Sequence, residues 1–421
     1  MIDARLEAGV RLGRTMPTRR AFLRQAGVLT ATGIIGNHVL GVAAAGQRSV
    51  TLPFENGTRE LVAYPGKRPL IVLTARPPQL ETPFAIFNEG LLTPNDAFFV
   101  RYHWSGLPTS IDPAAYRLKV GGHVDTPLDL SLDTLRRVAD PVDLVAVNQC
   151  SGNSRGHFTP RVNGGQLSNG AMGNARWTGV PLKKVLEKAG VKSGAVQVSF
   201  NGLDQPPIGD GPDFVKALAI DHALDGEVML AWQMNGAELP FLNGYPLRLV
   251  VPGYFGTYWI KHVSEIQVLD SAFQGFWMAS AYRIPDNSCA CVEPGTTPSA
   301  TKPIGRFPVR SFITSLQNDA RVPANRETVA RGIAFDGGQG VAEVVFSYDG
   351  GTTWQPARLG TNHGRYSFHE WTARFTPPKK GPLELKVRAT SRSGETQPLT
   401  ATWNPAGYMR NVVETVTVVA V

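Results

Sequence analysis

Cysteine is scarce in this sequence: the 421 residues include only three. The chain has no Cys-x-x-Cys-His motif for attaching haem and no group of four cysteines that could hold an iron–sulfur cluster. We therefore expect no haem in this chain. Cys289 and Cys291 are separated by one alanine, whereas Cys150 has no partner near it in the sequence.

The Cys289 and Cys291 pair is a weak signal for a metal site, because two thiols without a nearby histidine lack a full ligand set. A local disulfide and two free thiols both remain open. The sequence assigns this pair no function.

Clustered positive charge and long apolar runs are also missing. The formal net charge is +8, and residues 1–45 contribute half of it through six arginines and two acids. No stretch of Lys and Arg alternates with aromatic residues, which argues against nucleic acid as a partner and leaves a small anionic substrate compatible. Beyond residue 45 no apolar run predicts a transmembrane helix.

Residues 1–45 have the pattern of a twin-arginine signal peptide. Thr18-Arg19-Arg20-Ala21-Phe22-Leu23-Arg24 precedes a weakly apolar segment, and Ala43-Ala44-Ala45 supplies a cleavage signal. We expect cleavage after Ala45 and export of the folded protein to the periplasm, often with a cofactor already inserted. The weakly apolar segment contains too many polar residues for a typical transmembrane helix. Retention of the leader as a membrane anchor is therefore the minor alternative.

The rest of the chain predicts an α+β protein that is mostly β. Glycine (44) and proline (32) are abundant, and the apolar runs have strand length. The clearest predicted helix begins near Pro181, a residue that suits the first turn of a helix. It covers residues 182–189, one face of which is expected to be buried, and it ends at Gly190. The predicted strands of this part are 97–103, 144–147, 195–200, 227–234 and 246–251.

A second domain is expected after a loop-rich crossing from about Arg283 to Phe307. Val341–Tyr348 alternates apolar and polar residues, Asp349-Gly350-Gly351 turns, and a return strand begins at Thr352. Short strands at regular spacing predict an immunoglobulin-like β-sandwich. The further predicted strands of this sandwich are 366–375, 383–391 and 412–419. The predicted domains are 46–300 for the first domain and 308–421 for the sandwich.

The most informative stretch surrounds Cys150. An apolar run from Val145 leads into this cysteine, and a Gly/Asn/Ser loop with Arg155 follows. The pattern predicts a thiol at the end of a buried strand, where a neighbouring arginine favours the thiolate and can hold an anion. A small buried core residue is the alternative.

Arg101 and His103 form a second candidate. They alternate on a predicted strand, so both face one side. A surface ladder is possible, but the neighbouring Phe98, Phe99 and Trp104 favour burial, and a buried arginine needs a partner.

With these pieces placed, the chain resembles the sulfite oxidase family of molybdenum enzymes, in particular the bacterial periplasmic sulfite dehydrogenases that use a c-type cytochrome. The resemblance covers nearly all of the chain after the leader. It rests on the ordered motifs Phe99-Val-Arg101-Tyr-His103, the Cys150 loop, Gly170–Trp177, Asn201-Gly-Leu-Asp204, Met234-Asn-Gly236, Gly244–Arg248, Val251-Pro-Gly253, Trp259-Ile-Lys261 and Asp349–Trp354.

The resemblance implies one Mo-molybdopterin per chain, with Cys150 as the protein's ligand to molybdenum. Asn243 stands where animal relatives have histidine, which puts that contact in doubt. Without the resemblance, the polar residues among the cofactor contacts named below would be ordinary residues of turns and strands. The implied cofactor-binding residues are Phe99, Val100, Arg101, Tyr102, His103, Asp204, Asn243, Arg248, Trp259, Ile260 and Lys261.

For the substrate, the resemblance implies a cationic pocket for sulfite made by Arg101, His103 and Arg155. Tyr282 supplies a hydroxyl beside the reacting oxygen, and Trp177 forms a pocket wall. His369 stands about where animal relatives place a further arginine, and we do not count it as a site residue.

The expected activity is oxidation of sulfite to sulfate, with single electrons passed to a c-type cytochrome in a heterodimer or a transient complex. A homodimer through the final domain is a further possibility. The alternatives are a sulfane dehydrogenase subunit, a methionine sulfoxide reductase of the same fold, and a non-catalytic periplasmic binding protein.

Overall fold

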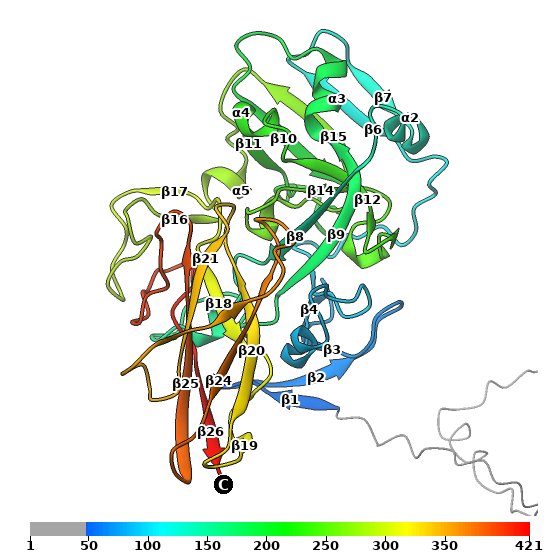
Figure 1. Cartoon of the computed structure of the whole chain (residues 1–421). Coiled ribbons are helices and arrows are strands. Elements are labelled where there is room, and N and C mark those ends of the chain that lie inside the picture. Colours follow the sequence, from blue (N-terminus) through cyan, green and yellow to red (C-terminus); the bar gives the residue numbers. More distant parts are fainter. Residues whose placement is uncertain (1–47) are drawn as a thin grey trace, which may run out of the picture. The chain divides into compact units, whose positions relative to one another are not determined.

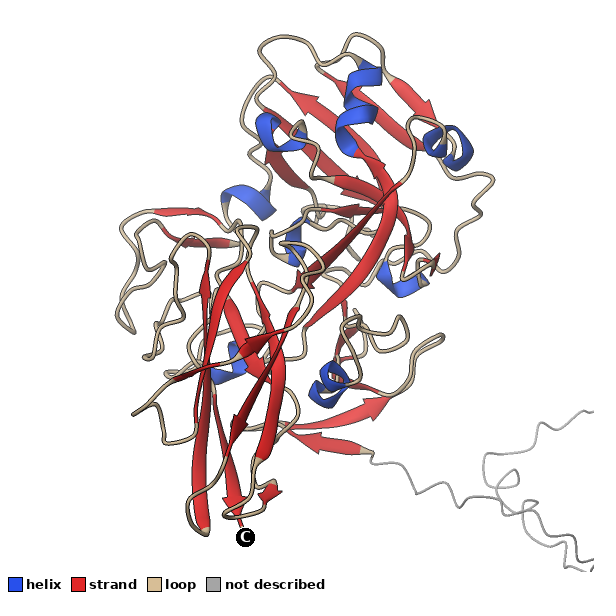
Figure 2. Cartoon of the chain, in the orientation of Figure 1, coloured by secondary structure: helices blue, strands red, loops and turns tan. Residues whose placement is uncertain are grey.

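Short strands dominate the computed structural model, which describes residues 48–421 (Figures 1 and 2). The longest described helix is α3, Leu182–Ala189, with eight residues. This confirms the prediction of a mostly β protein. The predicted leader at residues 1–45 lies outside the described residues. No helix in the described part is both long and apolar enough to cross a membrane.

The first sheet is an antiparallel array that ends beside the candidate site. Its strands follow in chain order, and the last one pairs with β4 over only two residues. The predicted strand at 97–103 is therefore much shorter than expected, because β4 itself has three residues and offers no longer edge. The strands are β1 (Ser49–Thr51), β2 (Thr58–Val62), β3 (Leu70–Thr74), β4 (Gln79–Glu81) and β5 (Val100–Arg101).

A second sheet has the order β11-β10-β15-β6-β7, and only β15 and β6 run parallel. A third sheet has the order β13-β12-β9-β8, with β14 also paired to β12. The strands are β6 (Leu118–Gly122), β7 (Leu128–Leu130), β8 (Val142–Gln149), β9 (Met172–Pro181), β10 (Gln197–Gly202), β11 (Lys216–Ala219), β12 (Met229–Met234), β13 (Ala237–Glu238), β14 (Arg248–Val250) and β15 (Val263–Leu269).

Helix α3 covers part of these sheets as its sequence predicts. Leu182, Val185, Leu186 and Ala189 are buried, and Gly190 ends the helix in the left-handed region with φ of 70°. Pro181 is the N-cap residue, one position before the first turn in which it was expected. The other short helices are η1 (Phe84–Asn88), α2 (Leu132–Arg136), η2 (Arg155–His157), α4 (Ile220–Ala223), η3 (Phe241–Asn243), η4 (Gly256–Tyr258) and α5 (Phe276–Ala279).

The crossing from Arg283 to Phe307 contains one small antiparallel pair, β16 (Arg283–Pro285) with β17 (Thr301–Pro303). Between these strands Cys289 and Cys291 form a disulfide. This decides between the two states that the sequence left open for the pair.

Two sheets then form the predicted β-sandwich, with orders β18-β20-β24-β23 and β19-β26-β25-β21-β22. Their inward side chains, such as Phe346, Trp371 and Leu385, build a separate core. The strands are β18 (Arg310–Ile313), β19 (Arg321–Val322), β20 (Thr328–Phe335), β21 (Val341–Ser347), β22 (Gln355–Pro356), β23 (Arg358–Leu359), β24 (His369–Phe375), β25 (Gly381–Ser391) and β26 (Thr415–Ala420).

The return strand after β21 begins later than predicted. The Asp349 carboxylate accepts hydrogen bonds from the backbone and hydroxyl of Thr353, at 2.9 and 2.6 Å. These bonds hold Thr352 and Thr353 in the turn, so pairing with β21 starts only at Gln355.

Aromatic side chains join the sandwich to the first part of the chain. Phe84 lies 5.4 Å from Phe312, and Phe87 lies 6.0 Å from Phe368, in edge-on arrangements. Both contacts belong to the large core cluster that also surrounds Cys150. The sandwich is therefore part of the framework that supports the site.

Gly332 tests the packing of the sandwich. A Cβ at this position would lie 1.9 Å from the Phe312 carbonyl oxygen and 2.5 Å from the Trp371 indole. We expect Gly332→Ala to destabilise the protein by about 1–3 kcal/mol, measured by thermal unfolding.

Gly209→Ala is the matched control, since its Cβ would meet nothing within 4 Å and its backbone is outside the left-handed region. Its effect should stay within about 0.5 kcal/mol. Equal shifts in the two variants would contradict the described packing around Gly332.

Candidate active site

Cys150 lies at the carboxyl end of β8, as the sequence predicts. It is a free cysteine and is 8% exposed. Its backbone N–H donates to Ala171 at 2.9 Å, and its carbonyl accepts from Asn153 at 3.0 Å. The Asn153 side chain in turn accepts from Ala171 N–H at 3.0 Å. These bonds fix a tight loop that turns the thiol away from the strand.

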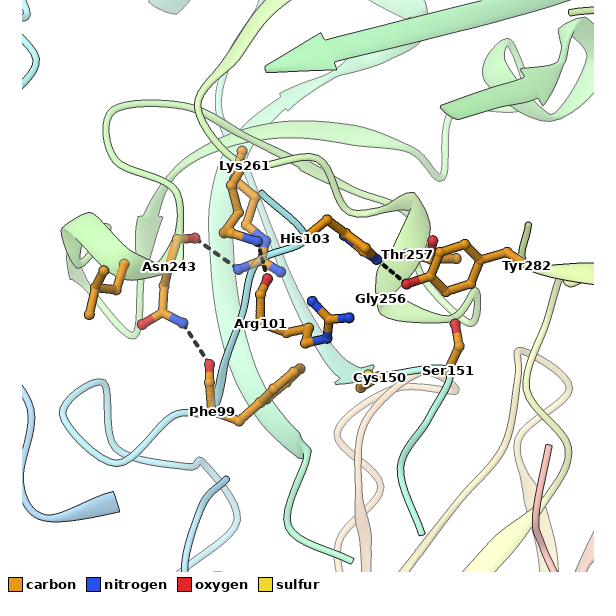
Figure 3. Close-up of a pocket in the computed structure, with 12 residues that line it drawn as sticks. Phe99, Arg101, His103, Cys150, Ser151, Asn243, Gly256, Thr257, Lys261 and Tyr282 are labelled. Atoms are coloured by element: carbon orange, nitrogen blue, oxygen red, sulfur yellow. Dashed lines mark hydrogen bonds between the residues drawn. The ribbon is translucent and has the colours of Figure 1, made fainter. Parts of the chain in front are cut away.

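Cys150 lines a small pocket, shown in Figure 3, which is called the cavity below. In that view the Arg101 side chain lies in the middle of the group, with Cys150 and Ser151 to one side and Lys261 and Asn243 to the other. Eight of the predicted site residues line this cavity: Phe99, Arg101, His103, Cys150, Asn243, Arg248, Lys261 and Tyr282. Residues from segments distant in the sequence are thus brought together by the fold.

Trp177 does not line the cavity, contrary to the expected pocket wall. It is fully buried on β9 and its indole donates to Ala146 O at 3.1 Å. The pleat of β9 turns Arg176 outward and Trp177 inward, so the indole packs behind Arg248, 5.3 Å from its guanidinium carbon.

Arg155 also lies outside the cavity lining. Its guanidinium donates to the carbonyl oxygens of Ala406 and Gly165, at 3.1 and 3.2 Å. These acceptors lie in loops of both domains. In this structure Arg155 is therefore held beside the Cys150 loop and makes no contact with the cavity itself.

The remaining predicted cofactor contacts support the cavity from behind. Tyr102 is buried and its hydroxyl pairs with His262 at 2.7 Å, while Val100 belongs to a small core beneath β5. Trp259 lies 5.6 Å from the Arg248 guanidinium, and the Ile260 carbonyl accepts from Leu249 N–H. Asp204 is 7% exposed, and burial raises the pKa of its carboxyl.

Four lining residues were missed in the sequence: Ser151, Leu242, Gly256 and Thr257. Ser151 follows Cys150 directly, so its position was a usable signal. Gly256 approaches β8 so closely that a Cβ would lie 2.6 Å from the Asn148 side chain. The hydroxyls of Ser151 and Thr257 are buried without a hydrogen-bond partner. They are therefore available to a ligand.

The cavity is cationic. Arg101, Arg248 and Lys261 line it, and no carboxylate does. Desolvation, followed by the positive charge of Arg248, lowers the pKa of Lys261 to about 7 against the opposing effect of Asp204, and desolvation lowers the pKa of Arg248 to about 10. The buried Arg248 Nε has no hydrogen-bond partner. Positive groups without counter-ions favour an anionic ligand at this place.

Lys67 adds a further positive group behind the cavity. Its Nζ donates to Asn243 Oδ1 at 2.5 Å and to Phe98 O at 3.0 Å. The Asn243 amide then donates to Phe99 O at 3.0 Å. Burial lowers the pKa of Lys67 to about 7. Lys67 thus fixes the orientation of Asn243, the residue whose role the sequence left in doubt.

His103 and Tyr282 form a hydrogen-bonded pair at the cavity wall. The His103 ring stacks on Phe214 with 3.9 Å between centroids. Desolvation, followed by the charge of Arg101, holds the pKa of His103 well below its usual value. Desolvation also raises the pKa of Tyr282. At neutral pH the pair is therefore uncharged and presents a hydroxyl that can donate to a ligand.

Lys216 lies behind this pair and is fully buried. Its Nζ donates to Trp277 O at 2.6 Å and lies 5.2 Å from the Tyr282 ring centroid. No described carboxylate forms an ion pair with it. Burial, with the nearby charge of Arg283, lowers the pKa of Lys216 to about 7.

Comparisons with known proteins agree with this geometry. Residues 104–277 match the family model of the oxidoreductase molybdopterin binding domain, and residues 301–420 match that of the Mo-co oxidoreductase dimerisation domain. Over 362 residues the chain is 34% identical to sulfite oxidase of Gallus gallus, covering 82% of this chain and 76% of that protein.

Other relatives extend the comparison. The chain is 33% identical to mitochondrial sulfite oxidase of Rattus norvegicus over 81% of its length, and spans 64% of that longer protein. The crystal structure of the sulfane dehydrogenase SoxCD from Paracoccus pantotrophus matches with a TM-score of 0.68 and 23% identity. That match covers 91% of this chain and 93% of the other, and it shows a shared fold.

The buried amine of Lys216 gives a stability prediction. Between about pH 7 and its unfolded value of 10.5, the unfolded lysine binds a proton that the buried amine releases. The folded state therefore gains about 1.4 kcal/mol per pH unit as the pH rises through this window, and loses it as the pH falls. We expect Lys216→Met to be more stable than the wild type at pH 7, with a difference that shrinks by pH 9.

Thermal unfolding at several pH values measures this effect. Lys184→Met is the control, because Lys184 is half exposed and pairs with Glu187 on the surface. It should show no such pH dependence. Parallel stability curves for the wild type and Lys216→Met would contradict the predicted pKa shift.

Proposed function

The chain belongs to the sulfite oxidase family of molybdenum oxidoreductases, and we propose that it is a periplasmic sulfite dehydrogenase that passes single electrons to a c-type cytochrome. The observation that carries this proposal is the cavity itself. It places the only free described thiol, Cys150, with Arg101 and the His103–Tyr282 pair.

The residues present fit an anionic pterin cofactor with a metal at Cys150. A thiolate is a soft ligand suited to such a metal. The unpartnered Arg248 Nε and Thr257 hydroxyl, and the amine of Lys261, supply donors for the pterin and its phosphate. When bound, the molybdenum cofactor supplies two-electron oxygen transfer, and the protein supplies binding and orientation.

The chain's own residues can hold sulfite beside the thiol. Arg101 offers a charged donor for an oxyanion and is oriented by a hydrogen bond to the Tyr102 carbonyl. Tyr282 offers a neutral hydroxyl donor, since the pKa of its hydroxyl is raised and that of its partner His103 is lowered. Phe99 adds an apolar side chain to the lining. This arrangement favours a small anion over a bulky neutral substrate.

Location and electron acceptor follow from the sequence. The twin-arginine pattern at residues 1–45 supports export of the folded, loaded protein. The given sequence contains no Cys-x-x-Cys-His motif, and the proposal therefore places the haem on a cytochrome partner. The match of residues 301–420 to a dimerisation domain is compatible with a homodimer, with the cytochrome bound as a separate partner.

Protein purified after export tests the proposal through two measurements on one sample. We expect about one molybdenum atom per chain, together with sulfite-dependent reduction of cytochrome c or ferricyanide. If the protein contains molybdenum and turns over a sulfane or methionine sulfoxide but not sulfite, the proposed substrate is wrong and that compound takes its place. Absence of both metal and turnover would overturn the proposal.

Replacement of the thiol is the sharpest variant. Cys150→Ser should abolish turnover while the unfolding temperature changes little, because the side chain keeps its size. The control is the double variant Cys289→Ser, Cys291→Ser, whose thiols form the disulfide away from the cavity. Full activity in Cys150→Ser would remove this residue as the metal ligand.

Arg101→Met tests the substrate contact. Loss of a charge-assisted hydrogen bond worth about 1.5–3 kcal/mol should mainly raise KM for sulfite, by about 10- to 150-fold. Steady-state kinetics with a matched Arg374→Met control would measure it, since Arg374 is 70% exposed on the sandwich. An unchanged KM would take Arg101 out of the substrate pocket.

A further inference from the structure

The second domain reaches the Cys150 loop through the segment Trp403–Glu414. Near its start the Trp403 indole donates to Pro160 O at 2.8 Å, and the Ala406 carbonyl accepts from Arg155 at 3.1 Å. At its end Glu414 pairs with Arg310 at 3.0 Å, and the same Arg310 nitrogen donates to Ser154 Oγ at 2.7 Å. The start of the segment is thus bonded directly to the first domain, and its end is linked through Arg310 to Ser154 in the loop after Cys150.

A tight turn inside this segment fixes one side chain. Asn404 accepts from Tyr408 N–H at 3.1 Å and donates to Tyr408 O at 2.9 Å. Gly407 has φ of 62°, and a Cβ there would lie 2.4 Å from Val162 and 2.8 Å from Arg155. Only glycine allows this close approach of the turn to the first domain. The backbone of Tyr408 is therefore held in place from both sides.

The ring of Tyr408 contacts two residues that the sequence assigned to the substrate pocket. It stacks on Tyr282, with 5.6 Å between centroids and 4° between planes. The Arg155 guanidinium carbon lies 5.0 Å from the Tyr408 centroid. Tyr282 itself has φ of 58°, a conformation that few non-glycine residues adopt without support from their surroundings. Tyr408 provides part of that support.

Simple packing between domains is the competing explanation for Tyr408. The phenylalanine contacts of Phe84 with Phe312 and of Phe87 with Phe368 already join the domains, and Phe87, Phe312 and Phe368 are buried. Tyr408 is only half-buried, and one of its ring partners, Tyr282, lines the cavity. Tyr408 packs at the edge of the large core cluster and also contacts a residue of the cavity wall, which core packing alone does not require.

We propose that Tyr408 is a positioning residue for sulfite oxidation, through which the second domain holds Tyr282 at the wall of the substrate pocket. This inference rests on the proposed function. Burial raises the pKa of the Tyr408 hydroxyl, with Arg155 acting in the opposite direction. The ring therefore acts as an uncharged platform, and its aromatic face matters more than its hydroxyl.

The test compares Tyr408→Leu and Tyr408→Met with Tyr408→Phe. The two aliphatic variants lose the stacking and cation–π contacts, so KM for sulfite should rise about tenfold while kcat changes less. Tyr408→Phe should restore KM to within about threefold of the wild type. Molybdenum content should remain equal to that of the wild type in all three variants.

Sulfate binding, measured by isothermal titration calorimetry, gives a readout that needs no turnover. Its Kd should weaken about tenfold in the aliphatic variants and recover in Tyr408→Phe. Tyr348→Leu is the matched control, since Tyr348 packs on Phe375 within the sandwich core and should change neither constant.

The outcomes separate the two proposals. If the wild type binds sulfate but does not oxidise sulfite, the proposed function is overturned. The sulfate Kd of the Tyr408 variants would then still test the positioning role of Tyr408. An aliphatic variant with unchanged sulfate Kd and unchanged KM would overturn the role of Tyr408. So would equal losses in Tyr408→Leu and Tyr408→Phe accompanied by a lower unfolding temperature, because they would indicate a merely structural side chain.

Discussion

Basic side chains that are buried without an ion-pair partner are the constraint on which the rest of this structure depends. Arg248 packs against the indoles of Trp177 and Trp259, which also contact each other edge-on, and its guanidinium donates to the Asn243 carbonyl. Lys261 donates to the Arg101 carbonyl in the same way. Desolvated cations are unfavourable alone, so a bound anion relieves the strain of the folded apoprotein.

The same constraint links cofactor binding to the proposed export route. A cavity that gains its counter-charge from a pterin phosphate is more stable when the cofactor is present. Export of a folded protein would then carry the cofactor enclosed by Phe99, Asn243 and Thr257. Lys67 lies in the loop before β3. Its hydrogen bonds to Asn243 and Phe98 hold these residues together behind the cavity.

The second domain contributes more than an interface. Glu414, Arg310 and Arg410 form a largely buried ionic group, and the two arginines hold the pKa of the Glu414 carboxyl below its usual value. Such a group is sensitive to the loss of any member, because the others would remain buried and unpaired. Through Ser154 it ties the sandwich to the loop after Cys150, and through Tyr408 the sandwich reaches Tyr282.

The sequence by itself determined the features that depend on local pattern. A β-branched run followed by glycine and serine placed Cys150 at a strand end, and the spacing of Leu182, Val185 and Leu186 defined the one clear helix. The alternating runs after residue 340 predicted the sandwich. These features depend on the periodicity of apolar side chains and on the backbone conformations that glycine allows. Both are set by residues that are neighbours in the sequence.

Only the tertiary structure decided which side chains share the cavity. Trp177 faces the core because of the pleat of β9, Arg155 is drawn aside by the Ala406 carbonyl, and Tyr408 arrives from a segment more than 250 residues after Cys150. Ser151, Gly256 and Thr257 joined the site through close approach of two loops. Contacts between distant segments depend on how whole sheets pack, and no local pattern in the sequence encodes that arrangement.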